Sequence, residues 1–99
     1  MNVQHTGWSR VMLLPVLLVL LGCGPSKEQQ AIDAYNRGVA HAEKGEYDKA
    51  ITDYTEVIRL VPNLAEPHYN RGNAYEKKGD QDKAEADFAK AKELGYEPE

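Results

Sequence analysis

The most restrictive feature of this sequence is a repeat with a period of 34 residues. Shifting the chain against itself by that distance places Tyr35-Asn36-Arg37-Gly38 on Tyr69-Asn70-Arg71-Gly72. A fixed period of this length indicates stacked copies of one supersecondary unit, because each copy buries its apolar face against the next. The same register aligns Ala31 with Ala65, Ala40 with Ala74, Lys44-Gly45 with Lys78-Gly79, Asp48-Lys49-Ala50 with Asp82-Lys83-Ala84, Asp53 with Asp87, and Leu60 with Leu94.

Start and stop signals divide each unit into two helices. Ser26 followed by Gln29 is a capping-box pattern that begins a helix, and Gly45 is suited to end one. Asn63 predicts a similar start for the third helix, with Pro67 in its first turn. The predicted helices run near 27–44, 47–60, 64–78 and 81–94. Helical spacing then gives two core-facing sets, Ala50, Tyr54, Val57 and Ile58 in one unit and Ala84, Phe88 and Ala91 in the other.

Each unit resembles the tetratricopeptide repeat. Small residues occupy its small sites, Gly38 and Gly72 in the first helix and Ala50 and Ala84 in the second; Tyr54 and Phe88 fill its aromatic site, and Pro62 closes the first unit. The departures are Ala34 and His68 where a Trp is usual, Arg37 and Arg71 before the glycine, and Tyr96 at the second closing proline. The resemblance implies an all-α fold of two helix-turn-helix hairpins, residues 31–64 and 65–98, that forms a fragment of an α-solenoid and binds another protein.

The amino-terminal region has the pattern of a secretory leader. Val11–Leu21 is an apolar run of eleven residues, too short for a spanning helix, which needs about 20. Leu20-Leu21-Gly22-Cys23 resembles the bacterial lipobox, which implies cleavage before Cys23 and acylation of its thiol. We therefore expect residues 1–22 to be a signal peptide and 23–30 to hold the acylated cysteine, a short tether and the helix start. The alternatives are an ordinary signal peptide, or a buried helix with a chance cysteine.

Cys23 is the only cysteine, so no disulfide can form within the chain. The residue that follows it bears on the location of the protein. In bacterial lipoproteins, whose lipobox this segment resembles, the residue after the cysteine directs sorting between the two membranes. Gly24 at this position, which is not Asp, implies the outer membrane. The expected location is therefore the bacterial envelope, lipid-anchored, with the periplasmic face of the outer membrane favoured over the inner membrane. If Ser26 caps the first helix, the tether spans only about 10 Å, so the partner must lie at the membrane surface.

The charged residues favour a solvated helical surface. The chain has 12 basic and 16 acidic residues, for a net charge of −4, interleaved at helical spacing rather than gathered in a basic stripe. Nucleic-acid binding is therefore disfavoured. Arg37 and Arg71 recur at one offset from Asp53 and Asp87, which predicts an ion pair repeated between the helices of each hairpin.

The sequence contains no arrangement of residues typical of catalysis. No nucleophile, base and orienting group share a meaningful spacing, so we expect neither an enzyme nor a cofactor. His41 and His68 could approach each other across the first helices of the two units. A metal ion would need more ligands, so packed or half-exposed histidines are the favoured interpretation.

In the tetratricopeptide family, the first helix of each repeat lines a concave groove. The tyrosines and asparagines of such a groove suit a short peptide, although Tyr35 and Tyr69 could simply pack. Only Asn70 matches the subset that grips chaperone tails, so that class of partner is disfavoured. Carried over by position, the groove residues are Ile32, Tyr35, Asn36, Val39, Ala42, Glu66, Tyr69, Asn70, Asn73, Glu76 and Lys77.

Repeats of this kind normally need three or more copies, and only two occur here. We expect Phe88, Ala91 and Leu94 to be partly exposed on the last helix, covered by a second copy or by another protein. The alternative is a marginal domain that frays. The favoured function is an adaptor or assembly factor of the envelope, and the alternatives are a structural subunit or an accessory regulator of an envelope complex or hydrolase.

Overall fold

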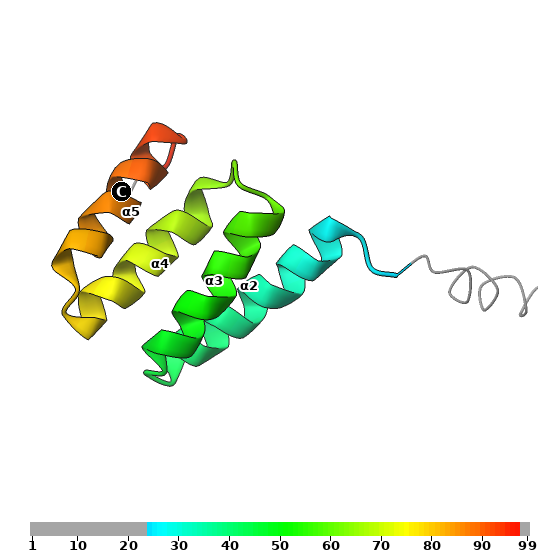
Figure 1. Ribbon diagram of the computed structural model, residues 1–99, viewed down its shortest axis with the longest axis horizontal. Coiled ribbons are helices and arrows are strands. Elements are labelled where there is room, and N and C mark those ends of the chain that lie inside the picture. Colours follow the sequence, from blue (N-terminus) through cyan, green and yellow to red (C-terminus); the bar gives the residue numbers. More distant parts are fainter. Residues whose placement is uncertain (1–23, 98–99) are drawn as a thin grey trace, which may run out of the picture.

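The computed structural model describes residues 24–97, which form four helices (Figure 1). They are α2 (Lys27–Glu43), α3 (Tyr47–Leu60), α4 (Ala65–Lys78) and α5 (Gln81–Glu93). Each bound lies within one residue of its predicted position, which confirms an all-α fold of two helical hairpins. None of these helices is long and apolar enough to cross a membrane. The predictions for the leader, the lipobox and Cys23 concern residues outside the described part.

The helix starts follow the predicted capping for α2 but not for α4. The Ser26 hydroxyl accepts a hydrogen bond of 3.1 Å from the backbone N–H of Gln29. The prediction for Asn63 is wrong, because Leu64 occupies the N-cap of α4 and no side chain caps that helix. Pro67 lies in the first turn of α4, where its missing N–H costs no helical hydrogen bond. Gly79, with a φ of 90°, ends α4 in the left-handed region that glycine tolerates.

In both hairpins the two helices pack through the same contact, a glycine against an aromatic ring. A Cβ added at Gly38 would lie 2.7 Å from the Tyr54 ring, and one at Gly72 would lie 2.7 Å from the Phe88 ring. The predicted small sites in the second helices, Ala50 and Ala84, are fully buried. Small residues therefore bring the two helices of each hairpin close together, as predicted.

The two hairpins pack through α3 and α4, so α3 contacts helices on both sides. A buried cluster of Ala31, Ala34 and Val57 lies inside the first hairpin, with Tyr35, Leu60 and Val61 packed against it. The start of α2, the turn between α3 and α4 and the end of α5 lie along one edge, and the other two turns lie along the opposite edge (Figure 1).

The last helix exposes less apolar surface than expected. Phe88 and Leu94 are half-buried, in line with the prediction, but Ala91 is fully buried and that part of the prediction is wrong. Ala91 follows Ala84 by two helical turns and therefore shares its buried face. The exposed positions of α5 hold Gln81, charged residues and alanines, with Glu85, Ala86, Ala89 and Lys90 among them. This helix therefore presents the kind of polar outer face that ends a stack of repeats.

The predicted arginine–aspartate pair recurs in both hairpins. Arg37 Nε lies 3.4 Å from Asp53 Oδ1 in the first. In the second, Arg71 donates through Nε and Nη2 to the two oxygens of the buried Asp87, both at 2.8 Å. This pairing raises the pKa of Arg71 above its ordinary value. Arg71 also donates to Thr55 Oγ1 at 3.1 Å, which ties the second hairpin to α3.

The two arginines should contribute unequally to stability. Replacing Arg71 by Ala leaves the Asp87 carboxylate buried without its bidentate partner, so we expect the free energy of unfolding to fall by about 3 kcal/mol. The Arg37 side chain is 57% exposed, against 19% for Arg71. Arg37→Ala should therefore cost less than about 1 kcal/mol. Urea unfolding followed by helical circular dichroism measures both losses, and equal losses would contradict this account of the pairs.

Candidate functional site

The groove prediction concerns the first helix of each repeat, α2 and α4. In the described surface α4 borders three hollows, and α2 borders two of these. The first hollow has a volume of about 420 Å³ and lies between the later turns of α2 and α4. Six of the predicted groove residues line it: Tyr35, Val39, Ala42, Asn70, Asn73 and Lys77. Glu43, Tyr47, Tyr54 and Ala74 complete its wall. Its wall is therefore aromatic on one side and amide-bearing on the other.

The second hollow lies between α4 and the chain that follows α5. It has a volume of about 800 Å³ and is lined by the predicted residues Tyr69, Asn73 and Glu76. Phe88, Lys92, Gly95, Tyr96 and Glu97 form the rest of its lining. Asn73 borders both hollows and is the residue that joins them. The predicted Asn36 is exposed on α2 and lines none of the three hollows.

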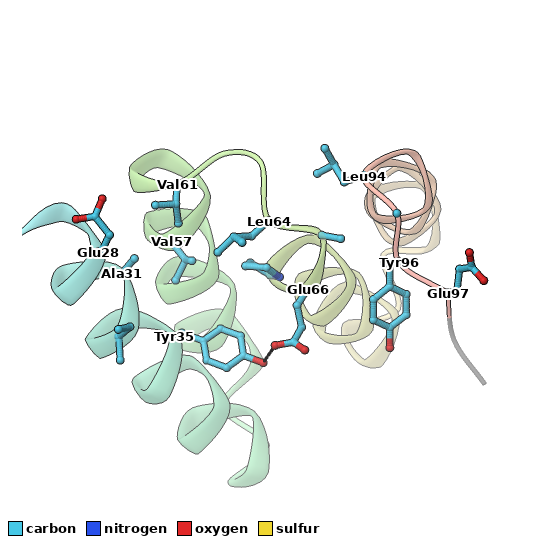
Figure 2. Close-up of a pocket in the computed structure, with 14 residues that line it drawn as sticks. Glu28, Ala31, Tyr35, Val57, Val61, Leu64, Glu66, Leu94, Tyr96 and Glu97 are labelled. Carbon is cyan, nitrogen blue, oxygen red and sulfur yellow. Dashed lines mark hydrogen bonds between the residues drawn. The ribbon is translucent and has the colours of Figure 1, made fainter.

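The third hollow is the most apolar and was not predicted as a unit (Figure 2). It has a volume of about 760 Å³ and combines the start of α2, the turn between α3 and α4, and the chain after α5. Of the predicted groove residues, Ile32, Tyr35 and Glu66 line it. Its other apolar side chains include Val57, Val61, Leu64 and Leu94. The sequence signal for it was the apolar character of the turn on both sides of Pro62.

Tyr35 is held by two hydrogen bonds that cross from one repeat to the other. Its hydroxyl donates to Glu66 Oε1 at 2.7 Å and accepts from Asn70 Nδ2 at 2.8 Å. Burial, together with the hydrogen bond and the negative charge of Glu66, raises the pKa of Tyr35 to about 12. Tyr35 and Asn70 therefore form part of the wall of the groove and are already partnered inside the chain.

The equivalent tyrosine of the second repeat is held differently. The Tyr69 ring stacks on Tyr96 at 4.2 Å between centroids and at an angle of 20°. It also lies against Phe88 at 5.4 Å. Tyr96, at the position where the first unit has a proline, thus places an aromatic ring against the N-terminal half of α4. The two tyrosines pack, and the polar groups left at the groove surface are chiefly Asn73, Glu76 and Lys77.

The two candidate metal-binding histidines have neighbours inside their own hairpins. His41 Nδ1 lies 2.8 Å from Glu46 Oε1, an interaction that lowers the pKa of Glu46. His68 is buried, and its Nδ1 lies 3.9 Å from Asp87 Oδ1. Residues 24–97 hold no group of three or more His, Cys, Asp or Glu side chains that could bind a metal ion. His41 thus lies beside an acidic side chain of its own hairpin, whereas His68 packs inside the second hairpin with neither ring nitrogen hydrogen-bonded to a described residue.

Comparison with known families gives two matches. Residues 38–79 match a family described as TPR repeat, and residues 65–94 match one described as Tetratricopeptide repeat. Together they extend from the middle of α2 to the end of α5. No curated protein matches the sequence.

The Tyr35 hydroxyl should contribute a pH-dependent part of the stability. Tyr35→Phe removes both cross-repeat hydrogen bonds, so we expect a loss of roughly 1–2 kcal/mol at neutral pH. The folded state holds this proton more tightly than the unfolded chain, whose tyrosine pKa is 10.0. The stability difference between wild type and variant is therefore full below pH 10 and shrinks as the pH rises towards 12.

The matched control is Tyr69→Phe at the equivalent position of the second repeat, which retains the stacked ring. Urea unfolding at several values of pH between 8 and 12 gives the difference for each variant. A difference for Tyr35→Phe that does not change over this range would contradict the assigned hydrogen bonds.

Proposed function

We propose that this chain, a tetratricopeptide-repeat protein, is a non-catalytic module that binds another protein or a peptide in the groove formed by α2 and α4. Tetratricopeptide repeats generally act as interaction modules, and nothing in the described residues favours catalysis. The observation that carries the proposal is the pair of adjoining hollows that meet at Asn73.

The polar groups of the groove favour an extended peptide with polar and aromatic contacts. Asn73 can donate and accept hydrogen bonds to a peptide backbone through its amide. Lys77 on one side and Glu76 on the other add charges of both signs within a single helical turn. Tyr35 and Tyr69 supply ring area that is already fixed in place, so a partner orders few side chains when it binds.

We further propose that the module is anchored in a bacterial envelope through an acylated Cys23. The leader-like residues 1–22 and the lipobox resemblance support this, as does the start of α2 at Lys27, which leaves only Gly24, Pro25 and Ser26 as a link. Two or three acyl chains give stable membrane residence, whereas one chain does not. Gly24 supports the outer membrane, with the domain on its periplasmic face. The partner would then be an envelope protein within reach of that surface.

One experiment in a bacterial host tests both parts. A photo-crosslinking amino acid replaces Asn73, and in a control chain it replaces Ala86, which is exposed on α5 away from the groove. We expect a discrete crosslinked product in the membrane fraction for position 73 and none for position 86, because only the first borders both hollows. Equal crosslinking at both positions, or none at either, would contradict groove binding.

The same cells test the anchor. The intact mass of the protein should correspond to a chain that begins at Cys23 and carries acyl groups, and Cys23→Ala should abolish both the modification and the membrane location. An unprocessed, unmodified chain in the wild type would overturn the anchoring part. The groove part would then depend on the crosslinks alone.

A further inference from the structure

The third hollow gathers the exposed aliphatic side chains of the described part of the chain. Ile32 is 52% exposed and Leu64 is 51% exposed, and they are the large hydrophobic side chains exposed among residues 24–97. Both line this hollow, together with the half-buried Val61 and Leu94. Figure 2 shows Val61, Leu64 and Leu94 along one side of the opening, above the hydrogen-bonded Tyr35 and Glu66. Exposed aliphatic side chains gathered in this way mark a contact surface.

The position of this hollow in the fold is tied to the chain that precedes α2. The hollow includes Glu28, Ala31 and Ile32, which lie in the first two turns of α2. That helix is fixed from its first residue, because Ser26 caps it and the Pro25 carbonyl accepts a 3.0 Å hydrogen bond from Gln30 Nε2. The link between Cys23 and the helix is therefore three residues long and spans about 10 Å at most.

We infer that this hollow is the surface on which the domain rests against the lipid bilayer, with Ile32 and Leu64 in the interfacial region. The inference rests on the proposed acylation of Cys23. An acylated cysteine holds the start of α2 within about 10 Å of the headgroups, and the exposed apolar side chains lie at that same edge. Because the tether already holds the domain at the membrane, the side chains meet the lipid at a high effective concentration. Two aliphatic side chains therefore suffice to orient the domain, where an untethered domain would need more.

The charges at the hollow specify which lipids it suits. The charged residues that line it are all acidic: Glu28, Glu66 and Glu97. Carboxylates repel anionic headgroups and pair with ammonium groups. The surface therefore fits a zwitterionic, ethanolamine-rich layer better than a layer rich in anionic lipid. The Glu66 carboxylate also accepts the Tyr35 hydrogen bond, which holds one of the three charges in place.

This orientation leaves accessible the part of the binding groove that lies between α2 and α4. The hollow lined by Val39, Asn73 and Lys77 lies towards the turns at the opposite edge of the molecule. With the apolar edge on the bilayer, those turns point into the aqueous space, and a partner approaches the groove from that side.

Depth-dependent fluorescence quenching tests this orientation. The only tryptophan of the chain, Trp8, lies within residues 1–22, so the processed protein with Leu64→Trp has a single reporter. The acylated protein, its mass confirmed, is reconstituted into phosphatidylethanolamine–phosphatidylcholine vesicles that carry a quencher near the headgroup end of the acyl chains. Lys44→Trp, exposed in the turn between α2 and α3, is the matched control. Circular dichroism checks that both variants keep their helices.

We expect Leu64→Trp to lose about half of its fluorescence and Lys44→Trp almost none, because an interfacial side chain reaches about 5–10 Å into the bilayer. Replacing half of the zwitterionic lipid with phosphatidylglycerol should weaken the quenching at position 64. An acylated protein quenched at neither position, or equally at both, overturns this inference and leaves the anchor intact. A protein without acyl groups overturns the inference and the anchor together.

Discussion

The structure depends on a ring placed against a glycine in each hairpin. Tyr54 lies on Gly38 and Phe88 lies on Gly72, with no room for a Cβ at either glycine. This contact sets the distance between the two helices of a hairpin. Ala50 and Ala84, one turn before each ring on the same helix, are fully buried and also allow the helices to lie close together. The close approach brings each arginine of the first helix within reach of an aspartate of the second. It also presents Tyr35 and Tyr69 on the surface that borders the hollows.

The two hairpins share this contact but differ in what they add to it. Tyr35 bonds Glu66 and Asn70 across the junction, and Arg71 reaches back to Thr55, so polar links join the repeats in addition to the packing of α3 on α4. Tyr69 instead stacks on Tyr96, which lies against the N-terminal half of α4. These links add to the packing that holds the two repeats together. The polar residues of the proposed groove, Asn73, Glu76 and Lys77, lie at positions that differ between the two repeats.

Much of this fold could be predicted from the sequence because its determinants are local or periodic. The period located the helices within one residue, and the shared offset of arginine and aspartate identified both ion pairs. Features that depend on contacts between distant segments could not be predicted. Asn63 is a residue type that often caps helices, but it lies one residue too early. The turn before α4 places Leu64 at the N-cap position. The pairing of Tyr35 with Asn70 joins two different repeats, so the offset shared within each repeat does not predict it. The apolar turn around Pro62 indicates only one of the three segments that form the apolar hollow. The residues of the groove and the lipid anchor at Cys23 stay predictions.

The central claim, that the ring-on-glycine contact sets the hairpin geometry, is tested most directly by the stability of Gly72→Ala. In an ordinary helix this change stabilises by about 1 kcal/mol, because alanine is the better helix former. Here the added methyl group would meet the Phe88 ring at 2.7 Å and the Ala84 carbonyl oxygen at 3.2 Å. The account predicts the opposite sign, a loss of about 1–3 kcal/mol in the free energy of unfolding, partly restored by adding Phe88→Leu. An unchanged or more stable Gly72→Ala protein would contradict it.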